Sequence, residues 1–320
     1  ALRLGYAGPA PAGRALRSGK SHAIALVVEE SLEYVLSDRY TQRLLAGIAH
    51  VCDAEGSGLA LVSLPSGRRV GWSIDTAIAD GFILHCFAVD SPLIGLAQRR
   101  GLPFTAIDAG PVADGASVDI DNVAAARTAA EHLIGIGHRH LAVLSLDMAD
   151  DGQVGLADIE RQSRVRFAST GARLEGYRAA CTAAGIAWSE VPVYETLNEP
   201  AATRDAVAAL LQRQPRPTAL LAMSDTIALA ACAALADLGV AVPGDISVVG
   251  IDDIAEAALA RPALTTIHQP IKEKGRIAAL MLFGRLQRSA VVLPAPLVIR
   301  DSTAPPPGAD NRSRMETPRP

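Results

Sequence analysis

The sequence predicts an α/β protein built from two Rossmann-like subdomains with parallel sheets. Short continuous apolar runs, such as 218–222 and 246–251, end in polar residues and are typical of buried strands. Between these two runs, 227–238 has apolar residues at helical spacing, and Gly239 follows where a helix would end. With 320 residues, the chain also exceeds the usual size of one hydrophobic core.

The first half of the chain alternates strand and helix patterns. We expect strands at 23–28, 59–63, 81–84, 104–107 and 141–144. Helical patterns lie between them at 40–51, 93–100 and 121–137. This alternation is typical of parallel strands that are joined by right-handed crossovers.

The second half repeats the alternation after a polar stretch at 148–170. We expect strands at 191–194, 218–222, 246–251, 264–267 and 292–299, and helices at 174–184, 203–213, 227–238 and 270–286. Long irregular stretches are usually functional or mobile. The 148–170 stretch is therefore either a flap over a ligand site or a surface excursion.

These patterns divide the chain into two subdomains joined by crossings near residues 145, 269 and 289. We assign 21–145 plus 270–288 to an N-terminal subdomain and 146–269 plus 289–303 to a C-terminal subdomain. Residues 304–320 are rich in proline and charge, which predicts a disordered tail. Two lobes connected in this way form a cleft that can close over a ligand.

Composition excludes several classes of protein. A formal net charge of -4 gives no overall nucleic-acid-binding surface, and the four cysteines have no CxxC spacing. No apolar run reaches membrane-spanning length, and no signal peptide is visible at the N-terminus. We therefore expect a soluble cytoplasmic protein without a cofactor. His138 has no metal-binding partner at suitable spacing, so we expect it to end a helix near the last carbonyl groups.

Polar side chains follow the predicted strands of the second half. Ser224 and Asp225 come after one strand, Asp252 after the next, and Gln269 after the third. Ligands of open parallel sheets bind beyond the carboxyl ends of the strands, so these residues predict a small-molecule site. A structural role is the alternative: Asp225 could cap the following helix, and Asp252 or Asp253 the next one.

The first half offers a facing wall for this site. Asp38 and Tyr40 lie where a helix begins after the first strand, and His85 follows the strand at 81–84. Polar and aromatic groups there would line the other side of the cleft. Spacing alone slightly favours the alternative, which is an ordinary helix cap for Asp38 and core or surface positions for the other two.

Three long runs carry a resemblance to a known family. They are residues 121–145 (DNVAAARTAAEHLIGIGHRHLAVLS), residues 173–186 (RLEGYRAACTAAGI) and residues 217–270, which begin PTALLAMSDTIALA and end PALTTIHQP. Together they resemble the lactose-repressor/galactose-repressor (LacI/GalR) family of bacterial transcription regulators. This resemblance implies the two-lobed fold of the periplasmic-binding-protein type, with effector binding in the interlobe cleft.

The N-terminal residues 1–20 resemble the end of the family's helix-turn-helix domain and its hinge helix. In this comparison Arg14 matches the hinge arginine, and Leu16 matches the leucine that is wedged into the DNA minor groove. No recognition helix is present in the 320 residues. The resemblance therefore implies that operator DNA is bound through a helix-turn-helix domain absent from this chain.

The resemblance also implies which residues contact the effector. Arg173, Ser224, Asp252 and Gln269 match ligand-binding positions of the family, and Ser224 stands where asparagine is usual. A guanidinium group can make paired hydrogen bonds to a hydroxyl or carboxylate ligand, and a carboxylate accepts hydrogen bonds from sugar hydroxyls. A sugar or sugar derivative is therefore the expected effector.

We conclude that the sequence encodes a ligand-responsive transcription regulator, expected to be a homodimer, whose effector either releases or recruits DNA. The alternative is a solute-binding receptor of the same fold that serves a transporter. An enzyme is not expected, because the sequence has no GxSxG, GxxxxGK[ST] or HExxH motif. Sequence upstream of the chain would distinguish the first two, since a regulator has a helix-turn-helix and a receptor has a signal peptide.

Overall fold

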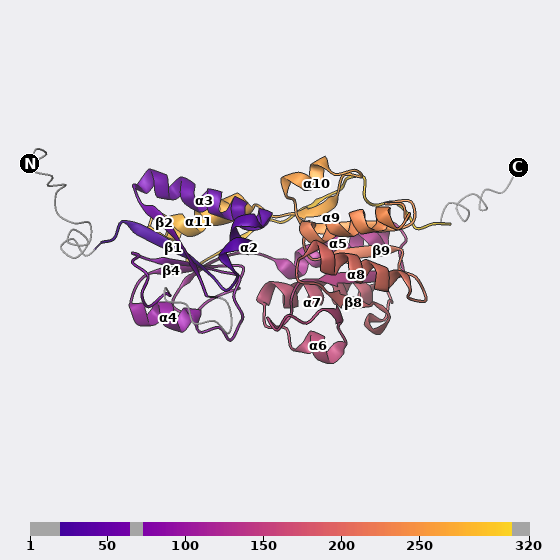
Figure 1. Ribbon diagram of the computed structural model, residues 1–320, viewed down its shortest axis with the longest axis horizontal. Helices are drawn as coiled ribbons and strands as arrows, with labels where there is room; N and C mark the ends of the chain where they lie inside the picture. The colour runs from indigo at the N-terminus through magenta and orange to yellow at the C-terminus, as the bar shows by residue number, and fades with distance from the viewer. Residues whose placement is uncertain (1–19, 65–72, 309–320) are drawn as a thin grey trace, which may run out of the picture.

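The computed structural model describes residues 20–64 and 73–308. In these ranges the chain forms two α/β lobes that lie side by side along the long axis of the molecule (Figure 1). The predicted fold class, two lobes with mainly parallel sheets, is confirmed. The hinge residues Arg14 and Leu16 lie outside the described residues, as does 309–320, the larger part of the predicted tail.

A parallel six-stranded sheet, in the order β12-β5-β4-β3-β1-β2, forms the centre of the first lobe. Its strands are β1 (Ala23–Val28), β2 (Gly58–Ser63), β3 (Phe82–His85), β4 (Phe104–Ile107), β5 (Ala116–Ile120) and β12 (Ala290–Leu293). The helices of this lobe are α2 (Leu32–Ser37), α3 (Arg39–Glu55), α4 (Leu93–Arg100) and α11 (Ile271–Leu282).

Strand β1 shows why both faces of this sheet carry helices. Leu26 belongs to the core beneath α3 and α11, whereas Val27, on the opposite face, belongs to the core beneath α4. Figure 1 shows α3 and α11 on one side of the sheet and α4 on the other. A strand that is buried on both faces needs an apolar residue at every position, and this is why its sequence does not alternate.

Two glycines set the close packing of α3 against α11. A Cβ atom added at Gly47 would lie 2.0 Å from the carbonyl oxygen of Lys272, and one added at Gly275 would lie 2.3 Å from that of Leu44. The two helix backbones therefore approach more closely than any side chain would permit. This contact holds α11, which comes late in the chain, against the first lobe.

The second lobe contains a seven-stranded sheet in the order β13-β11-β10-β9-β6-β8-β7, with antiparallel strands at its two edges. Its strands are β6 (Leu141–Ser145), β7 (Gly155–Leu156), β8 (Val193–Glu195), β9 (Ala219–Ala222), β10 (Ser247–Asp252), β11 (Thr265–His268) and β13 (Leu297–Val298). The helices are α5 (Asn122–Gly135), α6 (Ile159–Ser163), α7 (Ala168–Ala183), α8 (Pro200–Leu211), α9 (Asp225–Asp237) and α10 (Ala255–Leu259), with a 3-10 turn at Trp188–Glu190.

The chain crosses between the lobes after β5, after β11 and after β12, so two of the predicted boundaries are wrong. Strand β12 pairs with β5 in the first lobe, with Ala290 opposite Ser117. Helix α5 and strand β6, expected in the first lobe, belong to the second, where α5 packs on α7 and β6 pairs with β9. Strand pairing decides these assignments, and buried strands of both lobes look alike in sequence.

The segment at 292–299, predicted as one strand, is divided between the two sheets. Its first part belongs to β12 and its last part to β13, which runs antiparallel to β11. Pro294 and Pro296 lie between them and lack the N–H group that a continuing ladder would need.

His138 does end α5, because its backbone N–H donates to the Leu133 carbonyl oxygen at 3.1 Å, but its ring bonds to other parts of the second lobe. The ring is buried, and its Nε2 atom donates a hydrogen bond to the carbonyl oxygen of Ala304 at 2.9 Å. Arg139 instead donates to the carbonyl oxygen of Ile134 near the helix end. Ala304, the first residue of the predicted tail, also bonds to Ser247 through its N–H group and its carbonyl oxygen, so this residue is held against the second lobe.

Candidate effector-binding cleft

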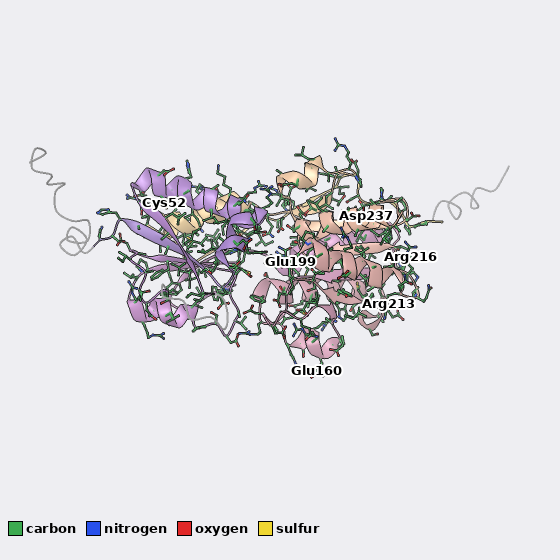
Figure 2. The ribbon with its side chains drawn as sticks, viewed as in Figure 1. Cys52, Glu160, Glu199, Arg213, Arg216 and Asp237 are labelled. Carbon is green, nitrogen blue, oxygen red and sulfur yellow. The ribbon has the colours of Figure 1, made fainter. Side chains whose placement is uncertain are left out.

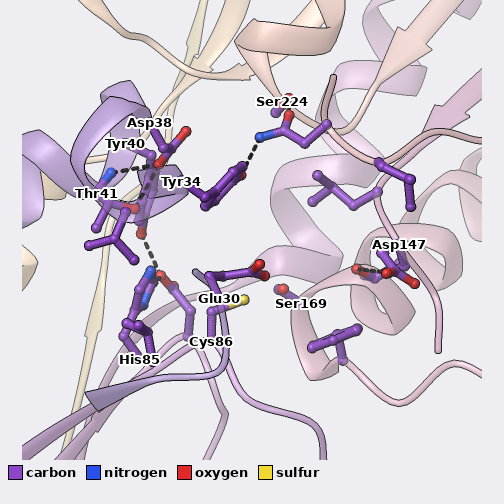
Figure 3. A pocket seen from close by; sticks show the side chains of 18 of the residues that line it. Glu30, Tyr34, Asp38, Tyr40, Thr41, His85, Cys86, Asp147, Ser169 and Ser224 are labelled. Carbon is purple, nitrogen blue, oxygen red and sulfur yellow. Dashed lines mark hydrogen bonds and ion pairs between the residues drawn. The ribbon is translucent and has the colours of Figure 1, made fainter. Parts of the chain in front are cut away.

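A cleft of about 380 Å³ lies between the two lobes and is lined by residues of both (Figure 3). The first lobe contributes the segment after β1, the start of α3 and the ends of β3 and β4. The second lobe contributes the segments after β6 and β9, the first turns of α7 and the end of β10. The cleft thus lies at the carboxyl ends of parallel strands, the usual position for a ligand site in such sheets.

The cleft brings together six of the seven residues predicted for the effector site. Arg173, Ser224, Asp252, Asp38, Tyr40 and His85 all line it. Gln269 is fully buried behind this lining and is not part of the cavity wall. Its amide group instead bonds to Asp252 of the second lobe and to Lys274 of the first lobe.

Ser224 has a structural role as well as a place in the cleft. It is the N-cap of α9, with its Oγ atom accepting a hydrogen bond from the Ile227 N–H at 3.1 Å. The same hydroxyl donates to Asn198 Oδ1 at 2.6 Å. Asp225, proposed from sequence as the cap, is instead the first residue of the helix and is fully buried, where it accepts hydrogen bonds from Thr266 and from the Ile254 N–H.

Asp252 is a buried carboxyl group at the floor of the cleft. Burial and the neighbouring charge of Asp225 raise the pKa of Asp252 well above its ordinary value. Gln269 Nε2 donates to it at 2.8 Å. A protonated carboxyl here can donate one hydrogen bond and accept others, which suits a hydroxyl-bearing ligand.

Neither Asp252 nor Asp253 caps the following helix, as the alternative had suggested. The N-cap of α10 is Ile254, which makes no side-chain capping bond. Asp253 pairs instead with Arg300 at 2.6 Å and with His268 at 2.8 Å, outside the cleft lining. These partners keep the pKa of Asp253 low against the opposing effect of its burial.

Arg173 extends from α7 into the cleft and is held by hydrogen bonds to the second lobe. Its Nε atom donates to Asn122 Oδ1 at 2.9 Å, and one terminal nitrogen donates to the Met223 carbonyl oxygen. The guanidinium group is therefore oriented before any ligand arrives. Fixing a planar donor in this way lowers the entropy cost of binding.

In the first lobe, Tyr40 and His85 form a stacked pair. Their ring centroids are 5.6 Å apart with an interplanar angle of 7°. The Tyr40 hydroxyl donates to Asp108, and burial followed by the charge of Asp108 raises the pKa of Tyr40 well above its usual range.

Asp38 is the N-cap of α3, where its carboxylate accepts a hydrogen bond from the Thr41 N–H at 2.8 Å. The sequence-based alternative of an ordinary cap is therefore correct for Asp38, which also lines the cleft.

Lys274, which the sequence analysis missed, connects the two walls beneath the cavity. Its ammonium group is fully buried and donates to Asp108, to the Tyr40 hydroxyl at 3.0 Å and to Gln269 Oε1 at 2.6 Å. Because Gln269 donates in turn to Asp252, a continuous chain of hydrogen bonds runs from the first lobe to the second. The sequence did contain a signal for this role, because Lys274 lies on the apolar face of α11 together with Ile271 and Ala278, where a charged residue is unusual.

Several other lining residues were not named individually from the sequence. They are Glu30, Tyr34, Asp108, Asp147, Ser169 and Asn198. Figure 2 shows Glu199 at the boundary between the lobes, and the Tyr34 hydroxyl accepts a hydrogen bond from Asn198 across this boundary at 2.7 Å. Except for Ser169, which is in the first turn of α7, these residues lie in loops or in the short helix α2, where neither period nor spacing marks a side chain as facing a ligand.

The 148–170 stretch combines both of the roles considered for it. Phe167, Ser169 and Thr170 line the cleft. The preceding part forms β7 and α6 at the outer edge of the second sheet, where Arg161 is buried between Glu195 and Asp151 at 2.8 Å and 2.6 Å. Most of the stretch is therefore ordered structure, and only its end reaches the cavity.

The chemistry of the cleft is that of binding. No group of three or more potential metal ligands occurs in the described ranges. The one thiol that lines the cleft, Cys86, has its pKa raised to about 12 by burial, so it is not an activated nucleophile. Oriented donors and acceptors from both lobes line the cavity, as binding of a polar ligand requires.

Comparison with known proteins places this geometry in a family. A model described as a periplasmic binding protein-like domain matches residues 130–303. The HTH-type transcriptional regulator Rv3575c of Mycobacterium tuberculosis is 37% identical over 316 residues, which cover 96% of this chain and 87% of the relative. The chain belongs to the LacI/GalR family of transcription regulators. The predictions of this family and of a protein that is not an enzyme are thereby confirmed.

Other members of the LacI/GalR family agree in sequence and in structure. The HTH-type transcriptional regulator CelR of Thermobifida fusca is 30% identical and covers 93% of this chain and 86% of its own length. A solved complex of CelR with cellobiose has a TM-score of 0.76 at 28% identity and covers 93% of each chain. A LacI-family regulator from Corynebacterium glutamicum has a TM-score of 0.76 at 26% identity, covering 92% of this chain and 88% of that one.

The relatives favour a regulator over the receptor alternative, since they are described as HTH-type transcriptional regulators. Among the described residues, no helix is both long enough and apolar enough to cross a lipid bilayer.

Proposed function

We propose that this LacI/GalR-family chain binds a sugar or sugar derivative in the interlobe cleft and that the bound effector controls operator DNA binding. The observation that carries the proposal is the convergence of polar side chains from both lobes on one cavity of about 380 Å³. Cavities of this size hold small organic ligands. The CelR–cellobiose complex supports a carbohydrate effector, because CelR has the same fold and a similar sequence.

Arg173 and Asp252 are the proposed contacts from the second lobe, with Ser224 beside them. His85, Tyr40 and Asp38 are the proposed contacts from the first lobe. A ligand that touches both lobes stabilises one closure angle, and it shifts the protein toward that state only by its difference in affinity for the open and closed forms. Gln269 and Lys274 act behind the lining by holding Asp252 and Tyr40 in place.

In a homodimer of the LacI/GalR type, closure would be read out by the hinges. Residues 1–20, including Arg14 and Leu16, would order on operator DNA in one closure state and not in the other. Operator recognition would come from a helix-turn-helix domain, the domain for which the relatives are called HTH-type regulators. The protein would act in the cytoplasm, where its DNA target lies.

A thermal-shift screen tests the effector site. The chain is mixed with monosaccharides, disaccharides, polyols and purines, and the same panel is applied to Asp252→Ala. A ligand that binds the native state raises the melting temperature by mass action. At least one sugar is expected to raise the melting temperature of the wild-type chain, and that rise should be lost in Asp252→Ala.

Asp237→Ala is the matched control, because Asp237 is an exposed acid of the same lobe, at its end away from the cleft (Figure 2). This variant should respond to the sugar like the wild type. A sugar response that persists in Asp252→Ala would place the effector elsewhere. DNA control is tested separately, by selecting genomic fragments with the helix-turn-helix-containing regulator in the presence and absence of that sugar.

A further inference from the structure

The side-chain amide of Asn198 joins the two lobes across the cleft. Its Nδ2 atom donates to the Tyr34 hydroxyl of the first lobe at 2.7 Å, and its Oδ1 atom accepts from the Ser224 hydroxyl of the second lobe at 2.6 Å. In Figure 3, the dashed line that leaves Tyr34 marks the bond to this amide. All three residues line the cavity, so they form an interlobe bridge made by the protein itself.

Asn198 is positioned by the second lobe. Its φ of 53° lies in the left-handed region, which asparagine adopts more readily than most residues. Its backbone N–H donates to the carbonyl oxygen of Thr196 at 2.9 Å. Thr196 is fully buried, and its hydroxyl donates to the carbonyl oxygen of Ser145 at the end of β6, at 3.0 Å. The amide is therefore held by the second sheet at the point where it meets Tyr34.

The Ser224 hydroxyl is used at both of its ends. Its single hydrogen is donated to Asn198, and its oxygen accepts from the Ile227 N–H in the first turn of α9. A serine hydroxyl has no second hydrogen to donate. While the interlobe bridge is formed, an effector can therefore meet Ser224 only as a hydrogen-bond acceptor.

The interlobe bridge differs from the exposed ion pairs that also join the lobes. The side chains of Arg39 and Glu256 are 57% and 42% exposed, and ion pairs of this kind contribute little. The Tyr34 hydroxyl is neutral, because burial raises its pKa well above the usual range. Its bond to Asn198 is partly buried, and a net hydrogen bond between neutral groups changes an equilibrium by about two- to ten-fold.

We propose that Asn198 is a positioning residue that holds the lobes closed before an effector binds, by joining Tyr34 to Ser224. This inference rests on the proposed function, because it concerns closure of the same cleft. An effector would enter while the interlobe bridge is open, and the bridge would form again when the lobes close around it. A sugar would then stabilise a closed form that the protein already populates.

Alkylation of Cys86 by iodoacetamide measures the open fraction. Cys86 lines the cavity, and burial raises the pKa of its thiol to about 12, so the closed form reacts slowly. When opening and closing are faster than alkylation, the rate is proportional to the open fraction. Mass spectrometry follows Cys86 together with Cys232 of α9, which lies outside the cleft lining and whose pKa burial also raises to about 12.

Tyr34→Phe and Asn198→Gly each remove one partner of the interlobe bond, and glycine keeps the left-handed backbone at position 198. In the 320-residue chain without sugar, each should raise the alkylation rate of Cys86 by about five-fold and leave that of Cys232 unchanged. The double variant should match the single variants, because the same bond is lost in all three. Tyr194→Phe is the matched control, since Tyr194 is a half-buried tyrosine of β8 outside the cleft lining, and it should react like the wild type.

Four results would overturn the proposed role of Asn198. They are unchanged Cys86 rates in the single variants, effects that multiply in the double variant, an equal rise in Tyr194→Phe, and a matching rise at Cys232, which would indicate unfolding of the second lobe rather than opening of the cleft. No sugar is present in these reactions, so none of the four results contradicts the proposed effector site. The thermal-shift screen and the DNA selection decide that function separately.

Discussion

At the scale of single residues, the buried ammonium group of Lys274 is the unexpected feature of this protein. It lies where the two lobes meet and bonds to Asp108, Tyr40 and Gln269. A buried charge is tolerated only when it is paired and fully hydrogen-bonded. The network therefore ties the geometry of the cleft floor to the stability of the whole fold.

Lys274→Met should destabilise the protein strongly, because it leaves Asp108 as a buried charge without its partner. Breaking a buried ion pair costs about 3–5 kcal/mol. Urea unfolding at pH 7 measures the change in the free energy of unfolding. Lys272→Met on the same helix is the control, since Lys272 is exposed, and it should change stability by less than about 0.5 kcal/mol.

The raised pKa of Asp252 predicts a pH effect on stability. Its reference value is 3.8, and the folded protein holds the proton to a much higher pH. Above about pH 4 the folded state binds more protons than the unfolded state, so the free energy of unfolding falls as pH rises toward the folded pKa. Asp252→Asn cannot ionise and should show a shallower fall between pH 4.5 and pH 7 in urea titrations. Equal slopes for the two proteins would show that Asp252 is ionised in the folded state.

At the scale of elements, the contact between α3 and α11 is set by backbone proximity. Helix α11 follows the second lobe in sequence but packs on the first, and Gly47 and Gly275 permit that contact. The helix also carries Lys274 to its position below the cleft. The packing of one helix pair thus supports both the first lobe and the floor of the site.

Gly275→Ala is expected to destabilise the protein, because the added methyl group would overlap the Leu44 carbonyl oxygen and the backbones would have to separate. Overpacking of this kind costs about 1–3 kcal/mol. Thermal unfolding followed by circular dichroism measures it. Gly135→Ala in α5 is the control, because nothing lies within 4 Å of its added Cβ atom, and alanine there should be neutral or slightly stabilising. A normal melting temperature for Gly275→Ala would mean that the two helices can separate without cost.

At the scale of the whole molecule, polar contacts at the edges of the cleft join the lobes in addition to the buried chain through Lys274 and Gln269. Arg166 pairs with Asp90 at 2.8 Å, and its carbonyl oxygen accepts from the Val89 N–H at 2.7 Å. On the other side, Arg43 donates to the Asp253 carbonyl oxygen at 2.9 Å. Such contacts are exposed enough to exchange with water, which suits lobes that open and close.

Reversing the charge at Asp90 should favour the open form. Asp90→Arg places two arginines together, and the radius of gyration from small-angle scattering is expected to rise. The double variant Asp90→Arg with Arg166→Asp should restore the wild-type value. Glu160→Arg is the control, since the Glu160–Arg164 pair lies within one lobe. No change in Asp90→Arg would mean that this pair does not influence closure.

The sequence by itself determined the two-lobed α/β fold and much of the second-lobe wall of the site. The apolar runs at β9 and β10 are buried on both faces and end in polar residues, so Ser224 and Asp252 could be predicted from local pattern alone. Asp225 and Asp253, which follow them at the carboxyl ends of these strands, could be located for the same reason. Local pattern is sufficient where a residue's position along its own strand decides its surroundings.

Only the tertiary structure decided which strand joins which sheet and which polar groups share a cavity. Strand β12 belongs to the first lobe because it pairs with β5, about 170 residues earlier, and nothing in its own sequence records that partner. Lys274 acquires its role from Asp108, 166 residues earlier, and from Tyr40, 234 residues earlier. Charge pairing and repulsion depend on distance in space, and for these residues that distance is set by the packing of two lobes.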